Sequence, residues 1–257
     1  MSIDAIIVLY NTDVKNIHAL SMLQSANEVN KIIICDNSTV TNENSFKCKQ
    51  WNKIKYNKMA GNIGLSKAYN IAIKEASSKY VLMLDDDTEL PEDFFQRVKQ
   101  HMDEINADVY IPLVKSKKIL MSPCKKGKYR FSAFRTPNEI TKPYSAINSG
   151  LIVRRKVFES IRYPENLFLD MIDHAFFDEL RRFDAKCCVM HDVVLTQDYS
   201  RETDNKQASR FRFKITKKDN KEYYKKNFMS RLFCNIQLMY WKFKLIVKFK
   251  DLRILFW

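Results

Sequence analysis

The stretch YVLMLDDDTELPEDF, residues 80–94, runs a short apolar segment directly into three adjacent carboxylates, Asp85, Asp86 and Asp87. Neighbouring carboxylates repel one another, and removing even one unpaired carboxylate from water is costly. The pattern therefore predicts a positive partner. A D-x-D at the end of a buried strand can place two carboxylates near one Mg²⁺ or Mn²⁺, which are hard cations that prefer oxygen ligands and often bind substrate phosphates. An acidic surface loop is the alternative interpretation.

Apolar, β-branched runs recur along the first 114 residues and predict strands at 5–10, 31–36, 80–84 and 108–114. The segments between them place apolar residues at three- and four-residue steps, which predicts helices within 16–29, 66–77 and 92–105. This alternation predicts an α/β fold with a mainly parallel sheet covered on both faces.

Three of the predicted strands end in polar residues. The first ends at Tyr10-Asn11, the second at Asp36-Asn37-Ser38, and the third at the three carboxylates. Ligands of such sheets bind beyond the carboxyl ends of the strands. The three strand ends therefore predict one shared site.

The same letters also match the D-x-D-x-T pattern of haloacid-dehalogenase-type phosphatases, in which the first Asp is the nucleophile. That motif normally opens its fold, whereas two strand–helix units precede it here. The sequence also has no convincing Gly-Asp-x-x-x-Asp element downstream. A phosphatase is therefore the weaker alternative.

Size and composition allow one large domain, or one domain with an appendage, because 257 residues that are 46% hydrophobic can bury a substantial core. The six cysteines form no CxxC pair and no regular framework, and the N-terminal MSIDAIIVLYN lacks the features of a signal peptide. We therefore expect a reducing cytoplasm as the location.

Six segments taken together resemble the family 2, GT-A-type inverting glycosyltransferases, and the bacterial branch that makes cell-surface polysaccharides, including rhamnosyltransferases, is the most similar. They occur in the family's order across about 180 residues: AIIVLYN, IIICDNST, NIGLSKAYNIAI, YVLMLDDDTELPEDF, INSGLIVRR and LFLDMIDHAFFDELRR. The resemblance implies a GT-A domain over residues 1–200, a nucleoside-diphosphate sugar (UDP- or dTDP-linked) as donor, and Mn²⁺ or Mg²⁺ as cofactor.

The family's roles transfer to matching positions of this chain. The resemblance implies that Asp87 is the main metal ligand and that Asp85 reaches the ribose or the metal. It assigns the remaining donor contacts to Asn11, Asp36, Asn62, Gly64, Lys67 and Asp86. Gly61 and Gly64 are also compatible with a simple turn. The family's sugar and acceptor pocket matches Asn148, Ser149 and Gly150, for which a polar turn before a strand is the alternative.

An inverting displacement needs a base that removes the proton of the acceptor hydroxyl. Asp170 and Asp173 are three residues apart, so on a helix both carboxylates would project to one side. We predict Asp173 as the base, with Asp170 as the second catalytic candidate, and we expect Asp178 on an exposed helix face.

The chain departs from the family pattern at two places. Relatives commonly carry an acidic residue two positions after Asp173, where this chain has Ala175. A donor-binding relative that lacks its base is therefore an alternative. Many relatives also place a metal- or phosphate-contacting His near Gln197, whereas His191 lies six residues earlier and is equally compatible with an ordinary strand-end histidine. His18 and His101 fall in predicted helices without a chemical role.

Residues 201–257 differ from the rest of the chain because they carry 16 Lys and Arg against 5 Asp and Glu. Basic residues alternate there with aromatic and aliphatic ones, and the longest charge-free run, 232–241, is far shorter than the roughly 20 residues that span a bilayer. We expect basic amphipathic helices on an anionic membrane surface, at the inner face of the cell membrane, where a lipid-linked saccharide acceptor would be found. Packing onto the main domain or a second subunit as a homodimer is the alternative. No recognised nucleic-acid motif accompanies the basic residues, so nucleic acid is not an expected partner.

Overall fold

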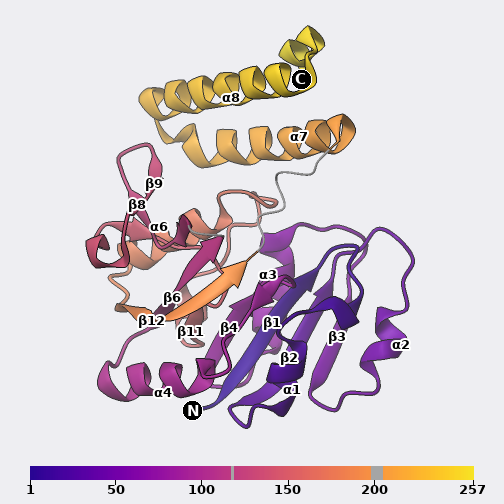
Figure 1. Cartoon of the computed structure of the whole chain (residues 1–257), viewed down its shortest axis with the longest axis vertical. Coiled ribbons are helices and arrows are strands. Elements are labelled where there is room, and N and C mark those ends of the chain that lie inside the picture. The colour runs from indigo at the N-terminus through magenta and orange to yellow at the C-terminus, as the bar shows by residue number, and fades with distance from the viewer. Residues whose placement is uncertain (117–118, 198–204) are drawn as a thin grey trace.

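The central sheet has the strand order β3-β2-β1-β4-β11-β6-β12-β5, with β7 paired to β6 (Figure 1). The computed structural model describes residues 1–116, 119–197 and 205–257. The strands that carry the predicted site are β1 (Ile3–Leu9), β2 (Val29–Asp36) and β4 (Tyr80–Leu84), and they pair in parallel. Their apolar side chains are buried because helices cover both faces of the sheet.

The predicted strands and helices of the first 114 residues are present. The strand predicted at 108–114 is β6 (Val109–Ser116), and the helices predicted within 66–77 and 92–105 are α3 (Leu65–Glu75) and α4 (Phe94–Glu104). The helix expected within 16–29 is shorter, because a 3₁₀ turn, η1 (Val14–Asn16), precedes α1 (Leu20–Ser25). His18 therefore lies before the helix and not within it.

The remaining strands complete the sheet on both sides. At one edge, β3 (Ile54–Lys58) pairs in parallel with β2, next to the short helix α2 (Asn44–Cys48). On the other side, β11 (Ile152–Arg154) runs antiparallel between β4 and β6, and β12 (Cys187–Gln197) runs parallel to β6. The short strands β5 (Thr88–Glu89) and β7 (Ile119–Ser122) pair with β12 and β6.

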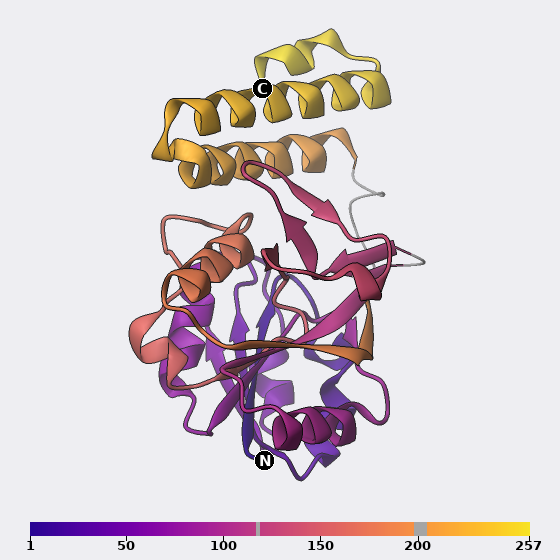
Figure 2. The ribbon, with the colours of Figure 1, turned by 90° about the vertical axis from the view of Figure 1, so that its left-hand side faces the viewer.

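A second, three-stranded sheet lies above the main one and consists of β8 (Cys124–Lys126), β9 (Phe131–Ala133) and β10 (Tyr144–Ser145) (Figure 2). The 3₁₀ turn η2 (Pro137–Glu139) lies between β9 and β10. Helix α6 (Ile172–Arg182) contacts β10 of this sheet, and α5 (Val157–Ser160) contacts β11 of the main sheet. Residues 119–147 thus contain β7 of the main sheet and all three strands of this second sheet.

The C-terminal residues form two long helices, α7 (Lys206–Tyr223) and α8 (Phe228–Phe249), joined by η4 (Tyr224–Lys226) and followed by η5 (Leu252–Phe256). They form two layers over the carboxyl ends of the parallel strands, with α7 between α8 and the main domain (Figures 1 and 2). A small core of their own, around Phe213, Cys234 and Leu238, joins the two helices. The boundary expected near residue 200 lies outside the described residues. No helix within the three described ranges is both long and apolar enough to cross a membrane.

Candidate functional site

A cleft of about 1040 Å³ lies across the carboxyl ends of the parallel strands. The residues that line it follow the strand ends: Tyr10 after β1, Asn37 after β2, Asp85–Asp87 after β4 and Gln197 at the end of β12. Asn62, Asp170 and Asp173 line the same cleft, so six of the residues predicted from the sequence are brought together there. The helices α7 and α8 form the opposite wall.

The carboxylates of Asp85 and Asp87 converge on one atom. The side-chain nitrogen of Gln197 donates to Asp85 Oδ2 at 2.9 Å and to Asp87 Oδ1 at 3.0 Å. The Ser149 hydroxyl also donates to Asp85, so the hydrogen of this hydroxyl is committed to that carboxylate. The sequence predicts a positive partner for these carboxylates, whereas the groups that donate to them here are a neutral amide and a hydroxyl of the chain itself.

Burial raises the pKa of Asp85, although the hydrogen bonds from Ser149 and Gln197 lower it, and the neighbouring Asp86 charge raises it further. Burial likewise raises the pKa of Asp87, against the hydrogen bond from Gln197. Raised pKa values indicate that ionisation of both carboxyl groups costs more free energy here than in water. A bound cation would remove that cost.

The donor set fits a hard divalent cation. The side-chain nitrogen of Gln197 lies between a carboxylate oxygen of Asp85 and one of Asp87, so a cation that took the place of this amide would contact both carboxylates. In the described ranges, no group of three or more His, Cys, Asp or Glu side chains is arranged to hold a metal. Asp85 and Asp87 would therefore provide two ligands, and a substrate and water the others.

Asp173 lies in the first turn of α6 and is held by its neighbours. The side-chain amide of Asn148 donates to Asp173 Oδ1 at 2.5 Å, and the Tyr163 hydroxyl donates to Asn148 Oδ1 at 2.8 Å. Burial raises the pKa of Asp173 well above its usual range, and the carboxylates of Asp85 and Asp170 raise it further. Asn148, expected to bind the acceptor, is itself buried and its side chain is committed to Asp173.

The expectation that Asp170 and Asp173 share one helix face is wrong. Helix α6 begins at Ile172, and Met171 before it has a left-handed backbone (φ 65°), so Asp170 lies outside the helix. Its carboxylate accepts hydrogen bonds from Arg212 and Thr216 of α7. Asp170 therefore links the loop before α6 to the C-terminal helices.

Helix α7 also holds that loop through a buried carboxylate. Asp219 accepts hydrogen bonds from the backbone amides of Phe168, Leu169 and Asp170 at 3.0, 2.8 and 2.9 Å. Three parallel contacts to consecutive amides fix the path of the chain immediately before the residue pair Asp170 and Asp173. The C-terminal region is thus built into the site.

Asp36 is enclosed by hydrogen bonds and does not line the cleft. Its carboxylate accepts bonds from the Ser38 amide and from the side chains of Asn42, Asn44 and Tyr56. Burial alone would raise the pKa of Asp36, but these hydrogen bonds outweigh it and lower the pKa. Its neighbour Asn37 lines the cleft instead.

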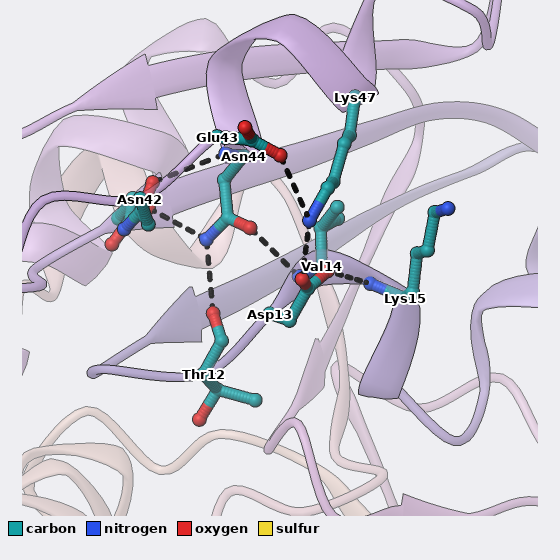
Figure 3. A network of polar contacts seen from close by, with 9 residues as sticks. Thr12, Asp13, Val14, Lys15, Asn42, Glu43, Asn44 and Lys47 are labelled. Atoms are coloured by element: carbon teal, nitrogen blue, oxygen red, sulfur yellow. Dashed lines mark hydrogen bonds and ion pairs between the residues drawn. The ribbon is translucent and has the colours of Figure 1, made fainter.

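The buried Asn44 connects the loops that follow β1 and β2 (Figure 3). Its amide donates to the Thr12 carbonyl and accepts from the Val14 amide, both at 2.9 Å, and Lys47 forms an ion pair with Asp13 beside it. Asn11, which is exposed, accepts bonds from the Thr39 and Val40 amides across the same junction. This network sets the shape of the rim formed by the ends of β1 and β2.

Gly64 is required by a close approach. It has φ 90°, and a Cβ there would lie 2.7 Å from the Phe168 ring. The Phe168 carbonyl accepts the Leu65 amide at 2.7 Å, so the first amide of α3 is bound by the chain itself. Lys67 is exposed on α3, outside the set of residues that line the cleft.

Gly150 also serves packing. It has φ 76°, and a Cβ would lie 2.1 Å from a Leu195 methyl and 2.9 Å from the Pro112 ring. These two side chains occupy the space beside Gly150, where the resemblance implies a contact with the sugar or the acceptor.

Three further expectations for single residues are wrong. Asp178 is not on an exposed face: it is partly buried, paired with Lys126 and Arg181, and accepts a bond from the Tyr223 hydroxyl. His191 lies within β12, at the register shift between Met190 and Val194, and is exposed, so it is not a strand-end residue. His18 is not helical, as described above.

Four residues of the site were not singled out from the sequence as members of it. Gln197 was noted only as the place of a missing histidine, and Asn37 only as part of a strand end. Tyr163 and Asp219 act through contacts with residues 15 and about 50 positions away, which no local pattern reveals.

Comparison with known proteins gives the same family as the motifs. The sequence model of Glycosyl transferase family 2 matches residues 4–162, more than half of the chain. The dTDP-rhamnosyl transferase RfbF of Shigella flexneri is 29% identical over 185 residues, which cover 67% of this chain and 60% of that protein. The chain thus spans about 60% of the length of this curated relative.

Solved structures show the same fold at low identity. S. aureus TarS residues 1–349 in complex with UDP-GlcNAc superpose with a TM-score of 0.57 and 16% identity, covering 84% of this chain and 65% of that one. GalNAc-T7 with UDP, GalNAc and Mn²⁺ superposes with a TM-score of 0.59 and 14% identity, covering 77% and 44%. The fold is the GT-A type expected from the motifs, and the family match removes the phosphatase alternative. The chain belongs to the family 2 glycosyltransferases.

Proposed function

We propose that this chain is a metal-dependent, inverting glycosyltransferase. It moves a sugar from a UDP- or dTDP-linked donor to a hydroxyl of a saccharide acceptor, in the synthesis of a bacterial surface polysaccharide. One observation carries the proposal: the paired carboxylates of Asp85 and Asp87 share a cleft with Asp173, a partly buried carboxylate that Asn148 holds by a hydrogen bond. The name of the RfbF relative supports a dTDP-linked donor, and the UDP complexes of the structural neighbours support a pyrimidine nucleotide.

The nucleotide would occupy the end of the cleft formed by β1, β2 and the start of α3. Tyr10, Asn37 and Asn62 line that end, while Asn11 and Asp36 hold the loops that shape it. Asp85 and Asp87 would hold Mn²⁺ or Mg²⁺ beside the diphosphate. That cation would neutralise the charge that develops on the leaving nucleoside diphosphate.

Asp173 would act as the base. Its raised pKa makes the carboxylate a better proton acceptor than an exposed aspartate, provided that it is ionised in the reactive state. The Asn148 amide would hold the carboxylate in the orientation that faces the acceptor hydroxyl, from the side of the sugar opposite the leaving group. Asp85, which would face the donor, lines the same cleft and accepts a hydrogen bond from the buried Ser149 hydroxyl.

A competing proposal is a donor-binding relative that lacks its base, since Ala175 stands where relatives carry an acidic residue. The geometry favours an active enzyme, because Asp173 is supported by two hydrogen-bonded residues and lines the cleft.

The acceptor would be carried on a membrane lipid. Helix α8 exposes a stripe of large apolar side chains, spaced at three and four residues, on the face opposite the one that packs on α7: Phe228, Leu232, Ile236, Tyr240, Phe243 and Val247. Lysines and arginines flank the stripe, which suits the surface of an anionic bilayer at the inner face of the cell membrane. A second copy of the chain is the competing occupant of this face.

The proposed reaction is tested by release of nucleoside diphosphate from a panel of UDP- and dTDP-sugars with Mn²⁺, with and without an organic extract of bacterial membranes as acceptor. We expect extract-dependent release by the full-length protein, and a decrease of at least about 10²-fold in Asp173→Asn. Equal release by Asp173→Asn would exclude Asp173 as the base. Donor binding without any release would favour the impaired relative.

A further inference from the structure

Gln197 lies beside the three adjacent carboxylates because a short strand pair places it there. The turn Asp85–Asp87 joins β4 to β5, and β5 pairs antiparallel with the end of β12, so that Gln197 lies across from Thr88. Gln197 is partly buried and lines the cleft together with the three carboxylates. The backbone therefore fixes the start of this side chain within reach of the carboxylates.

Three contacts set the orientation of the Gln197 amide. Its nitrogen donates to Asp85 Oδ2 at 2.9 Å and to Asp87 Oδ1 at 3.0 Å. Its oxygen accepts from the Ser149 hydroxyl at 3.2 Å. An amide nitrogen has two N–H donors and accepts no hydrogen bond, so both of its donors are used by the two carboxylates. The group between Asp85 and Asp87 therefore presents hydrogen atoms to them and offers no ligand atom to a cation.

A cation and the Gln197 nitrogen cannot serve the same two carboxylate oxygens at once. The hydrogen of an N–H···O bond lies about 1.9–2.0 Å from the oxygen. Mg²⁺ binds oxygen ligands at about 2.0–2.1 Å, so it needs the positions that these hydrogens hold. The hydrogens also carry partial positive charge, which repels a cation. The amide therefore has to leave Asp85 and Asp87 before both can bind the metal.

We infer that Gln197 competes with the cation for Asp85 and Asp87: its amide holds the two carboxylates together while no cation is bound, and the cation displaces it. Two neighbouring carboxylates repel each other, and N–H donors between them reduce that repulsion. The same contacts weaken the binding of a cation to the free protein. The inference rests on the proposed function and adds to it a residue that sets the affinity for the metal.

The test uses three variants of the full chain: Gln197→Ala, Gln197→Met, and Gln96→Ala as a control. Methionine keeps the length of the side chain but has neither the N–H donors nor the amide oxygen. Gln96 is an exposed glutamine of α4, outside the set of residues that line the cleft. Binding of Mn²⁺ is measured from the electron paramagnetic resonance signal of the free ion, without nucleotide and with dTDP or UDP. The melting temperature is measured in EDTA and in Mn²⁺.

We expect Gln197→Ala to bind Mn²⁺ at least about fivefold more tightly than the wild type, because the cation no longer has to break two hydrogen bonds to carboxylates. Gln197→Met should change in the same direction, and Gln96→Ala should match the wild type. In EDTA we expect a lower melting temperature for both Gln197 variants, and a larger rise on addition of Mn²⁺ than in the wild type.

Unchanged Mn²⁺ affinity in Gln197→Ala would overturn the inference. Weaker affinity would also overturn it, and would show that Gln197 turns its oxygen to the cation as a ligand. Gln197→Met decides between these outcomes if Gln197→Ala does not fold. A folded wild type that binds neither Mn²⁺ nor either nucleotide contradicts the proposed function itself, whereas a wild type that binds them leaves the comparison with the variants to test Gln197 alone.

Discussion

The side-chain nitrogen of Asn148 lies 2.5 Å from Asp173 Oδ1, and the Tyr163 hydroxyl donates to the side-chain oxygen of the same asparagine. In Asn148→Ala the carboxylate of Asp173 loses the donor that orients it. We predict a decrease in kcat of about 10- to 100-fold, with little change in the KM for the donor. Steady-state kinetics with saturating acceptor measures this.

A merely structural role for Asn148 makes a different prediction. If Asn148 only supported packing, Asn148→Ala would lower the melting temperature and leave kcat per folded molecule unchanged. Asn166→Ala, which removes an exposed asparagine that pairs with Glu222, is the matched control and should keep wild-type kinetics.

The dependence of transfer on pH follows from the raised pKa of Asp173. A base must be ionised to accept a proton, and a raised pKa keeps the carboxyl protonated to higher pH than an ordinary aspartate. We predict that kcat/KM for the acceptor rises with pH through the pKa of Asp173. In Asn148→Ala the rise should move to higher pH, because a hydrogen bond that favours the charged form is lost. A profile that is identical in both proteins would argue against Asp173 as the titrating group.

Much of the fold could be predicted because strand and helix periodicity are local. The buried runs that became β1, β2, β4 and β6 alternate with helical spacing, and polar residues mark the strand ends. Asp85–Asp87 could be placed at the site for the same reason. The edge strand β3 is not among the predicted strands, because its sequence IKYNK carries two lysines and none of its residues is buried.

The roles of several site residues depend on contacts that sequence spacing does not reveal. Asn148 looks like a polar turn residue until Asp173, 25 positions later, is folded beside it. The position of Asp36 at a strand end is typical of a ligand-binding carboxylate, but Asn44 and Tyr56 donate hydrogen bonds to it in the folded chain. The basic composition of the C-terminal region indicates a membrane surface, with packing onto the main domain as the alternative. No local pattern shows that α7 forms a wall of the cleft.

The link between α7 and the site predicts a stability effect at Asp219. Asp219→Ala leaves the backbone amides of three partly buried residues without their acceptor, so we expect the free energy of unfolding to fall by at least about 3 kcal/mol. Urea denaturation followed by circular dichroism measures it. Lys218→Ala, at an exposed position of the same helix, should change stability by less than about 0.5 kcal/mol. Equal stability of the two variants would show that the Asp219 contacts do not hold the loop.

The apolar stripe of α8 predicts binding to anionic vesicles. We expect the full-length protein to float with vesicles that contain phosphatidylglycerol, less so at high salt, and the double variant Leu232→Glu/Phe243→Glu to lose at least about tenfold in affinity. Phe46→Glu, at an exposed phenylalanine of α2, is the control and should float like the wild type. A protein that stays in solution but forms a dimer, which the double variant breaks, would assign the stripe to a second copy of the chain.

The central claim is that Asp85 and Asp87 hold a divalent cation beside the diphosphate of the donor. Isothermal titration calorimetry with dTDP and with UDP, in Mn²⁺ and in EDTA, tests it most directly, with Asp87→Asn as the variant. We predict that at least one of these nucleotides binds the wild type in Mn²⁺, at least about tenfold more weakly in EDTA, and that this difference disappears in Asp87→Asn. Binding with equal affinity in Mn²⁺ and EDTA, or no binding of either nucleotide by the folded wild type, would contradict the claim.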